Sequence, residues 1–298
     1  MDIKRKNYKP DKNSVGKEKS DGGEPVPVAK VKLRLDVKDV VRKGDGAAPE
    51  DNPLSRNGIT LLYEDNHIIV VVKPQNVPSQ ADSSGDPDML TVIKQYIAEK
   101  YGKPGNVFLG LVHRLDRPTG GVMVFAKTSK AATRLSEQIK SEDGDFEKMY
   151  AAVTFGRPYK TGKLEHYLFK DTQTNTVTVV PSTLDGAKKA ISEVTLRDEK
   201  DGLSFVTVKL VTGRTHQARV QLKAVGAPII GDRRYSPDKA PKAKNLALWA
   251  YKLSFSHPTT GDKMTFLAEP PSEYPWQLFD LVSLTDVIRP QNSSHYFD

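Results

Sequence analysis

The sequence predicts an α+β domain in which a mixed, largely antiparallel central sheet has flanking helices and a cleft across it. Three observations lead to this fold class. Short apolar segments with strand composition alternate with short turns, which favours antiparallel neighbours. Two longer segments have apolar residues at helical spacing instead. The 298 residues are 37% hydrophobic and 28% charged, which is the balance of a globular protein with a substantial core.

Strand-like segments make up most of the apolar sequence. Residues 59–74 are predicted to form two short strands around a turn at 64–66, and Pro74 ends the second strand. Further strands are expected at residues 120–128, 147–156, 176–180, 190–196, 203–211, 246–255 and 263–270. Several of them are separated only by short turns, so much of the sheet should be antiparallel.

Two helices are predicted to lie against this sheet. Residues 88–102 carry aliphatic side chains at helical spacing, and Gly102 is the expected end of the helix. Residues 129–141 form the second helix, for which Ser129 is the expected N-cap.

The two ends of the chain differ in composition from the middle. The first residues contain few apolar side chains and many Lys, Asp and Gly, which indicates a disordered basic tail. An alternating segment at 31–37 predicts one strand, and a linker rich in Gly, Pro, Asp and Asn follows it. We therefore expect a tail at 1–25, a strand and linker at 26–58, the main domain at 59–285 and a C-terminal tail at 286–298.

The composition excludes several kinds of chemistry. The chain has no cysteine, which rules out disulfides, thiolate zinc sites and thiol nucleophiles. It has no glycine-rich phosphate loop, no dinucleotide fingerprint and no paired-histidine metal motif, so no cofactor or metal is expected. No segment resembles a signal peptide or a membrane span, which predicts a cytoplasmic protein. The formal charge of +8 favours a polyanionic partner such as nucleic acid.

The stretch VHRLDRPTGG, residues 112–121, places a carboxylate between two cations. Asp116 stands between Arg114 and Arg117, and two glycines follow that allow backbone and substrate to approach closely. Taken alone, the stretch also fits a surface turn with a solvated ion pair.

Three other stretches have both a functional and a structural interpretation. Residues 211–222 interleave Arg214, His216 and Arg219 with apolar residues, as a basic amphipathic surface helix would. Lys73 ends a buried strand and fits a plain strand terminus. Tyr150 fits either core filling or a flat surface for a nucleobase.

Together and in this order, these stretches resemble the RluA-type pseudouridine synthases. HRLDRPTGG is similar to the family's signature around its catalytic aspartate. The other similar segments are VVVKPQNVPSQ (70–80), KMYAAV (148–153), GRTHQARVQLKAVGAPIIGDRRY (213–235) and LALWAYKLSFSHPTTGDKMTFLAEPP (246–271). Three positions depart from the usual family pattern, namely Ala218, Gln221 and Trp249, and we expect them to affect substrate choice rather than activity.

The resemblance implies a fold, a reaction and a set of residue roles. It implies the pseudouridine synthase fold with a catalytic cleft, and isomerisation of specific uridines in ribosomal or transfer RNA without cofactor or metal. Asp116 would be the catalytic carboxylate, kept ionised by Arg219, with Tyr150 stacking on the base or transferring a proton. Arg114 would enter the space left by a flipped base. The expected RNA-binding residues are Lys73, Arg114, Arg117, Arg214 and His216.

Two other classes of protein remain open at this point. A non-catalytic RNA-binding protein could keep the same scaffold, and a hydrolase could use an aspartate nucleophile.

All three predicted catalytic residues come from one chain, so a monomer is expected. An ionised carboxylate can act on a nucleoside as nucleophile or base. The sequence does not distinguish attack on the sugar, attack on the base, and removal of a sugar proton.

Overall fold

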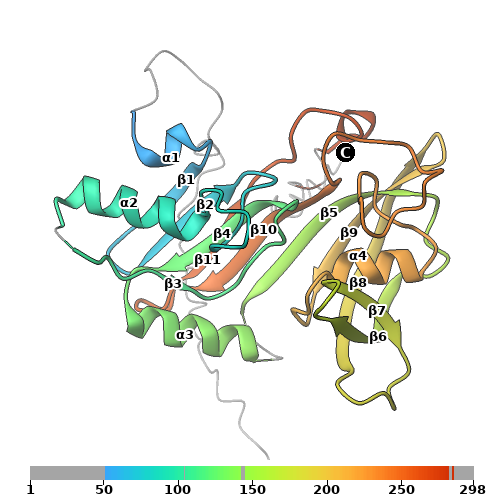
Figure 1. Ribbon diagram of the computed structural model, residues 1–298, viewed down its shortest axis with the longest axis horizontal. Helices are drawn as coiled ribbons and strands as arrows, with labels where there is room; N and C mark the ends of the chain where they lie inside the picture. Colours follow the sequence, from blue (N-terminus) through green and yellow to red (C-terminus); the bar gives the residue numbers. More distant parts are fainter. Residues whose placement is uncertain (1–50, 104, 142–144, 282–283, 285–298) are drawn as a thin grey trace, which may run out of the picture. The chain divides into compact units, whose positions relative to one another are not determined.

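The computed structural model describes residues 51–103, 105–141, 145–281 and 284 (Figure 1). The strand expected at 31–37 and the two tails lie outside these residues. The described part is built on a mixed sheet, and none of its helices is long and apolar enough to cross a membrane.

The sheet runs in the order β1-β2-β4-β10-β5-β9-β8-β6-β7, with β11 beside β10 and β3 beside β4 (Figure 1). Its strands are β1 (Thr60–Glu64), β2 (Ile68–Lys73), β3 (Gly110–Leu111), β4 (Gly120–Ala126), β5 (Glu147–Phe155), β6 (Gly162–Asp171), β7 (Thr176–Val180), β8 (Lys188–Lys200), β9 (Leu203–Leu210), β10 (Leu248–Ser256) and β11 (Lys263–Leu267). Within the described residues, β4 and β10 pair in parallel and the other neighbours pair antiparallel. The predicted fold class is confirmed.

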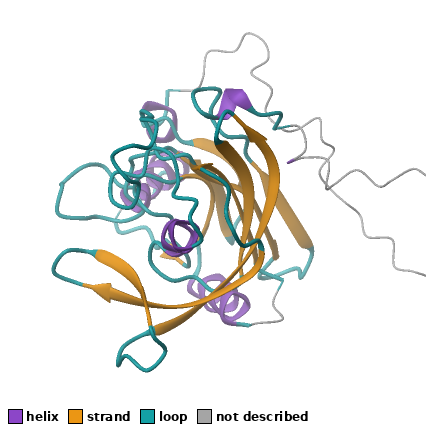
Figure 2. Ribbon diagram, turned by 90° about the vertical axis from the view of Figure 1, so that its right-hand side faces the viewer, coloured by secondary structure: helices purple, strands orange, loops and turns teal. Residues whose placement is uncertain are grey.

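Helices lie against this curved sheet (Figure 2). They are α1 (Pro53–Arg56), α2 (Met89–Tyr101), α3 (Ser129–Lys140), α4 (Gln217–Ala224) and the 3₁₀ helix η2 (Trp276–Leu278). Alternate residues of β2 belong to separate hydrophobic clusters, one containing residues of α2 and the other residues of α3. Because both faces of β2 are covered, its sequence is an unbroken apolar run rather than an alternating one.

The helix ends follow local capping chemistry. Gly102 ends α2 in the left-handed conformation, as expected. The expected N-cap of α3 is wrong by one residue. Thr128 occupies that position, and its hydroxyl accepts the N–H of Ala131 at 3.2 Å. A side-chain acceptor at the N-cap satisfies an N–H that has no partner within the helix.

Four elements were missed in the sequence, namely η2, which has only three residues, and β6, β3 and α1. Strand β6 buries only Leu164 and Leu168 fully, so it lacks the apolar alternation by which strands are recognised. Strand β3 has only two residues. Helix α1 lies within the expected linker, yet Leu54 is only 2% exposed and belongs to the core.

Candidate active site

A cavity of about 710 Å³ opens among segments that are distant in sequence. Its lining residues come from 76–82, 114–118, 215–219 and 231–246, together with Lys170 and Asn175. Five of the residues expected at the site line it, namely Arg114, Asp116, Arg117, His216 and Arg219.

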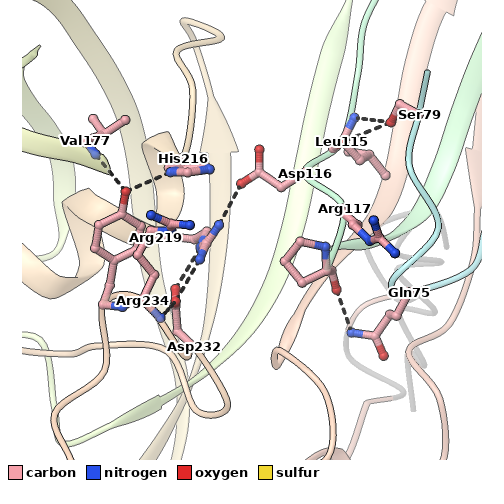
Figure 3. A network of polar contacts seen from close by, with 12 residues as sticks. Gln75, Ser79, Leu115, Asp116, Arg117, Val177, His216, Arg219, Asp232 and Arg234 are labelled. Atoms are coloured by element: carbon pink, nitrogen blue, oxygen red, sulfur yellow. Dashed lines mark hydrogen bonds and ion pairs between the residues drawn. The ribbon is translucent and has the colours of Figure 1, made fainter. Parts of the chain in front are cut away.

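The turn that carries Asp116 is held through its backbone. The carbonyl of Asp116 accepts the N–H of Thr119 at 2.9 Å. The hydroxyl of Ser79 donates to the carbonyl of Leu115 at 2.8 Å and accepts the N–H of the same residue at 3.3 Å (Figure 3). Gln75 donates to the carbonyl of Pro118 at 3.2 Å. These contacts fix where the Asp116 side chain leaves the backbone.

Lys73 is part of this support and not an RNA contact as expected. Its side chain is completely buried, and its Nζ lies 2.9, 2.6 and 3.0 Å from the carbonyls of Pro74, Val77 and Arg117. Burial lowers the pKa of Lys73 to about 7, although the charge of Asp116 opposes the shift. An ammonium has three N–H donors, and all three are directed at these carbonyls. The side chain therefore ties the end of β2 to the Asp116 turn.

Arg219 joins Asp116 to a second carboxylate. Its Nη1 lies 3.4 Å from Oδ2 of Asp116, while its Nε and Nη2 each lie 2.8 Å from an oxygen of Asp232 (Figure 3). Asp232 is fully buried and also accepts the N–H groups of Arg234 and Tyr235. Burial acts to lower the pKa of Arg219, but the two carboxylates more than offset this and raise it. The guanidinium is thus a fixed charge.

His216 stands between Tyr235 and Asp116 (Figure 3). The hydroxyl of Tyr235 accepts the N–H of Val177 at 2.9 Å and lies 2.7 Å from Nδ1 of His216. Tyr235 is only 4% exposed, and within the described residues Nδ1 is the one acceptor for its proton. That accounting places the imidazole proton on Nε2. Burial lowers the pKa of His216 and favours this neutral form, as do the charges of Arg219 and Arg234, while Asp116 opposes them.

Tyr150 lies in the core beside the site rather than on the cavity surface. It is 7% exposed, belongs to the main hydrophobic cluster and is not among the cavity-lining residues. Burial raises the pKa of its hydroxyl, and the charge of Asp116 raises it further. The phenol is therefore neutral, and it is near enough to Asp116 to respond to that carboxylate.

The remaining predicted contacts differ in availability. Arg114 is exposed in the cavity, and within the described residues its side chain makes no hydrogen bond or ion pair. Arg117 is bound by Asp82 and Asp86 and donates to the carbonyl of Asn76. Arg214 is exposed but does not line the cavity, and its Nε donates to the carbonyl of Lys189.

Comparison with known proteins agrees with this geometry. The family model for RNA pseudouridylate synthase matches residues 67–224. The dual-specificity RNA pseudouridine synthase RluA of Escherichia coli is 33% identical over 73% of this chain and 95% of its own length. The ribosomal large subunit pseudouridine synthase D of Xanthomonas campestris is 31% identical over 76% of this chain and 69% of its own length.

The chain belongs to the RNA pseudouridylate synthase family. It is thus an RNA pseudouridine synthase, an isomerase. The human RNA pseudouridylate synthase domain containing 4 has the same fold, with a TM-score of 0.60 at 22% identity over 73% of this chain and 90% of its own. The human RNA pseudouridylate synthase domain containing 1 gives a TM-score of 0.59 at 22% identity, over 78% and 94% of the two chains.

In this pseudouridine synthase, the close backbone approach expected at the glycines after the Asp116 turn is present, and the approaching segment is β10. A Cβ on Gly120 would lie 2.2 Å from a ring carbon of Trp249. A Cβ on Gly121, where φ is +124°, would lie 2.2 Å from the carbonyl oxygen of Ala250. Both distances are far shorter than a van der Waals contact. Because β4 and β10 approach so closely there, only glycine fits at these two positions.

The three positions that depart from the family pattern are interior. Ala218, Gln221 and Trp249 are all buried, and none lines the cavity. The amide of Gln221 bonds to Ser192 and to the carbonyls of Leu164 and Ala190. In the structure these side chains take part in packing. The interpretation of 211–222 as a surface helix is also wrong, because α4 begins at Gln217 and buries residues 217–222.

Sequence reasoning missed several residues of the site. Asp232 is the main partner of Arg219, and its position in the Gly-Asp-Arg-Arg-Tyr run of the matched motif was the available signal. Four basic residues also line the cavity without having been singled out, and they are Lys170, Arg233, Arg234 and Lys244. No isolated motif marks them, because their meaning depends on where the fold places them.

Proposed function

We propose that this pseudouridine synthase converts uridine to pseudouridine in ribosomal or transfer RNA, with Asp116 as the reacting carboxylate. One observation carries the assignment. The Asp116 side chain is 26% exposed in a 710 Å³ cavity while its partner Arg219 is 6% exposed. The carboxylate is thus accessible to a nucleoside, whereas the cation that contacts it is shielded from solvent.

The geometry of Arg219 leaves Asp116 free to react. Asp232 takes the two short contacts of the guanidinium, and Asp116 receives a longer one of 3.4 Å. Charge-assisted hydrogen bonds at full strength are about 2.7–2.9 Å long. Arg219 therefore orients the Asp116 carboxylate without tightly engaging its lone pairs.

The reaction needs only rearrangement within the nucleotide. The bond between the sugar and the uracil nitrogen breaks, the base turns, and a bond forms from the same sugar carbon to carbon five of uracil. Carbon five then loses its proton, and the freed ring nitrogen takes one up. An ionised carboxylate supplies the nucleophile or base that these reaction steps require. No electron acceptor enters the balance, and no residue proposed here calls for a cofactor.

A uridine within a paired or stacked region must leave the stack to reach Asp116. Flipping costs a few kcal/mol. Arg114 is the exposed cavity residue suited to occupy the space that the base leaves, as family resemblance implies.

His216 presents its Nε2 proton to the same cavity and can donate to the substrate. Tyr150, with its raised pKa, can act in proton transfer as a neutral phenol.

The RNA target, location and assembly follow from the relatives and the site. One relative is named for the large ribosomal subunit and the other for dual specificity, and both names are consistent with a ribosomal or transfer RNA substrate for this enzyme. We place the enzyme in the cytoplasm with such RNA. We also infer a monomer, because Asp116, Tyr150 and Arg219 all come from one chain.

Release of tritium from RNA labelled at carbon five of uracil tests the proposal. Wild-type enzyme should release the label, Asp116→Asn should abolish release, and Arg219→Met should reduce it at least a hundredfold while the protein stays folded. Lys130→Ala, an exposed change on α3, is the control and should match wild type. Free uracil among the products would indicate a hydrolase, and RNA binding without release of label would indicate a binding protein.

A further inference from the structure

The two long connections that border the cavity carry opposite charges. The connection from α4 to β10, residues 225–247, contains five Lys or Arg and two Asp. The connection from β2 to α2, residues 74–88, contains three Asp and no Lys or Arg. Both contribute residues to the lining of the same cavity. Its rim is therefore electrically asymmetric.

The basic side of the rim presents unneutralised cations. We call Lys170, Arg233, Arg234 and Lys244 the basic wall, because these four residues line the cavity and are exposed. Within the described residues, the side chains of Lys170, Arg233 and Lys244 make no hydrogen bond or ion pair. Arg234 donates to the carbonyl and hydroxyl oxygens of Thr174 and Thr176, which are neutral. Among the described residues that the α4–β10 connection contributes to the cavity lining, the one acid is Asp232, and it is bound to Arg219.

The opposite side differs in how its cations are placed. Among the described lining residues, the Asp116 turn contributes Arg114, which is expected at the position of the flipped base, and Arg117, whose guanidinium is bound by Asp82 and Asp86 of the 74–88 connection. A phosphate approaching this side would have to displace two carboxylates, and it would be repelled by them until it did so.

We propose that the RNA backbone on either side of the substrate nucleotide lies along the basic wall, with its phosphates paired to Lys170, Arg233 and Lys244. This inference rests on the proposed function, which makes RNA the substrate. Each phosphate neutralised by a Lys or Arg releases condensed counterions, and that release supplies sequence-independent affinity. The guanidinium of Arg233 also matches phosphate geometry in a bidentate way.

The wall is anchored to the residue that holds Asp116. Asp232 accepts the backbone N–H groups of Arg234 and Tyr235 at 3.0 and 3.1 Å, and it binds Arg219 with the same carboxylate. A phosphate held at the Arg233–Arg234 part of the wall is therefore positioned with respect to the Asp116 carboxylate through Asp232 and Arg219. In this arrangement the backbone contacts determine which nucleotide stands over the cavity.

Salt dependence of RNA binding tests the proposal on the full-length protein. The probe is a fluorescein-labelled RNA stem-loop with uridines in its loop, measured by anisotropy over a series of salt concentrations. The triple variant Lys170→Ala, Arg233→Ala, Lys244→Ala should bind more weakly. Its slope of log affinity against log salt should be shallower by about 2, since each contact to single-stranded RNA contributes about 0.7.

Two matched variants make the result specific. Lys103→Ala, Lys130→Ala, Lys140→Ala removes the same charge from exposed positions that do not line the cavity, and it should keep most of the wild-type slope. The triple variant Lys170→Arg, Arg233→Lys, Lys244→Arg keeps all three positive charges, so its affinity and salt slope should be close to those of the wild type.

The outcomes separate this inference from the proposed function. An unchanged slope in the alanine triple variant, or an equal loss in the distant triple variant, would overturn the basic wall. If the wild type released no tritium from RNA while the alanine triple variant still showed the predicted loss of slope, the proposed function would fail and the basic wall would stand.

Discussion

The β2–α2 and α4–β10 connections hold the same aspartate in two different ways. The β2–α2 connection bonds to the backbone of the Asp116 turn through the side chains of Ser79 and Gln75. The α4–β10 connection acts through charged side chains, because Asp232 fixes the guanidinium that faces the Asp116 carboxylate. Peptide groups need only neutral donors and acceptors, whereas a buried guanidinium needs an opposing carboxylate. One connection thus places the backbone of the reacting residue, and the other places the cation that faces its carboxylate.

The same division extends to the surface. The α4–β10 connection uses one carboxylate internally and leaves its cations exposed, while the β2–α2 connection uses its exposed carboxylates to bind Arg117. Opposite sides of one cavity therefore offer an anionic substrate very different fields, although each contributes to holding the Asp116 turn.

Asp232→Asn should have the largest effect, because it removes the charge that balances Arg219. Breaking a buried ion pair from one side costs about 3–5 kcal/mol, so the free energy of unfolding should fall by about 3 kcal/mol or more. Urea denaturation measures the change. Adding Arg219→Met to this variant should recover part of the loss, since no uncompensated cation then remains. A loss below about 1 kcal/mol in the single variant would show that Asp232 does not stabilise the guanidinium.

Ser79→Ala should have a smaller effect on the other side. It removes the hydroxyl that satisfies both backbone groups of Leu115, which should cost about 1–3 kcal/mol of unfolding free energy. Steady-state tritium release should show a lower kcat with little change in KM, because the Asp116 turn loosens while the basic wall is intact. Ser83→Ala, an exposed change in the same connection, is the control. A rise in KM alone would place Ser79 in substrate binding.

Replacing Asp82 and Asp86 by Asn should have the smallest effect, and in the favourable direction. The double variant frees Arg117, so RNA should bind severalfold more tightly and the salt slope should steepen by about 1. Anisotropy with the labelled stem-loop measures both quantities. Asp185→Asn with Asp201→Asn makes the same charge change elsewhere on the surface. If both double variants tightened binding equally, general charge and not Arg117 would be responsible.

The sequence predicted structure best where a continuous run of apolar residues indicated a buried strand. Apolar runs located β2, β4 and β9, and the resemblance suggested that Asp116 and Arg219 would meet. Strand β6 was missed because a mostly solvated hairpin has little apolar periodicity.

The errors at the site have a common physical cause. Lys73 was expected to bind RNA because of the family resemblance, and only the fold shows that backbone carbonyls surround it. Gly120 and Gly121 were expected to let backbone and substrate approach closely, and only the fold shows that the approaching backbone is β10, more than a hundred residues away. A partner's identity depends on long-range contacts, which local sequence patterns do not encode.

The contact between Arg219 and Asp116 spans 103 positions along the chain. Closing the chain over such a separation has an entropic cost, and non-local contacts of this kind slow folding. During synthesis, the aspartate emerges long before its guanidinium. An incomplete chain therefore lacks the assembled reactive centre, and competence for chemistry is acquired only at a late stage of folding.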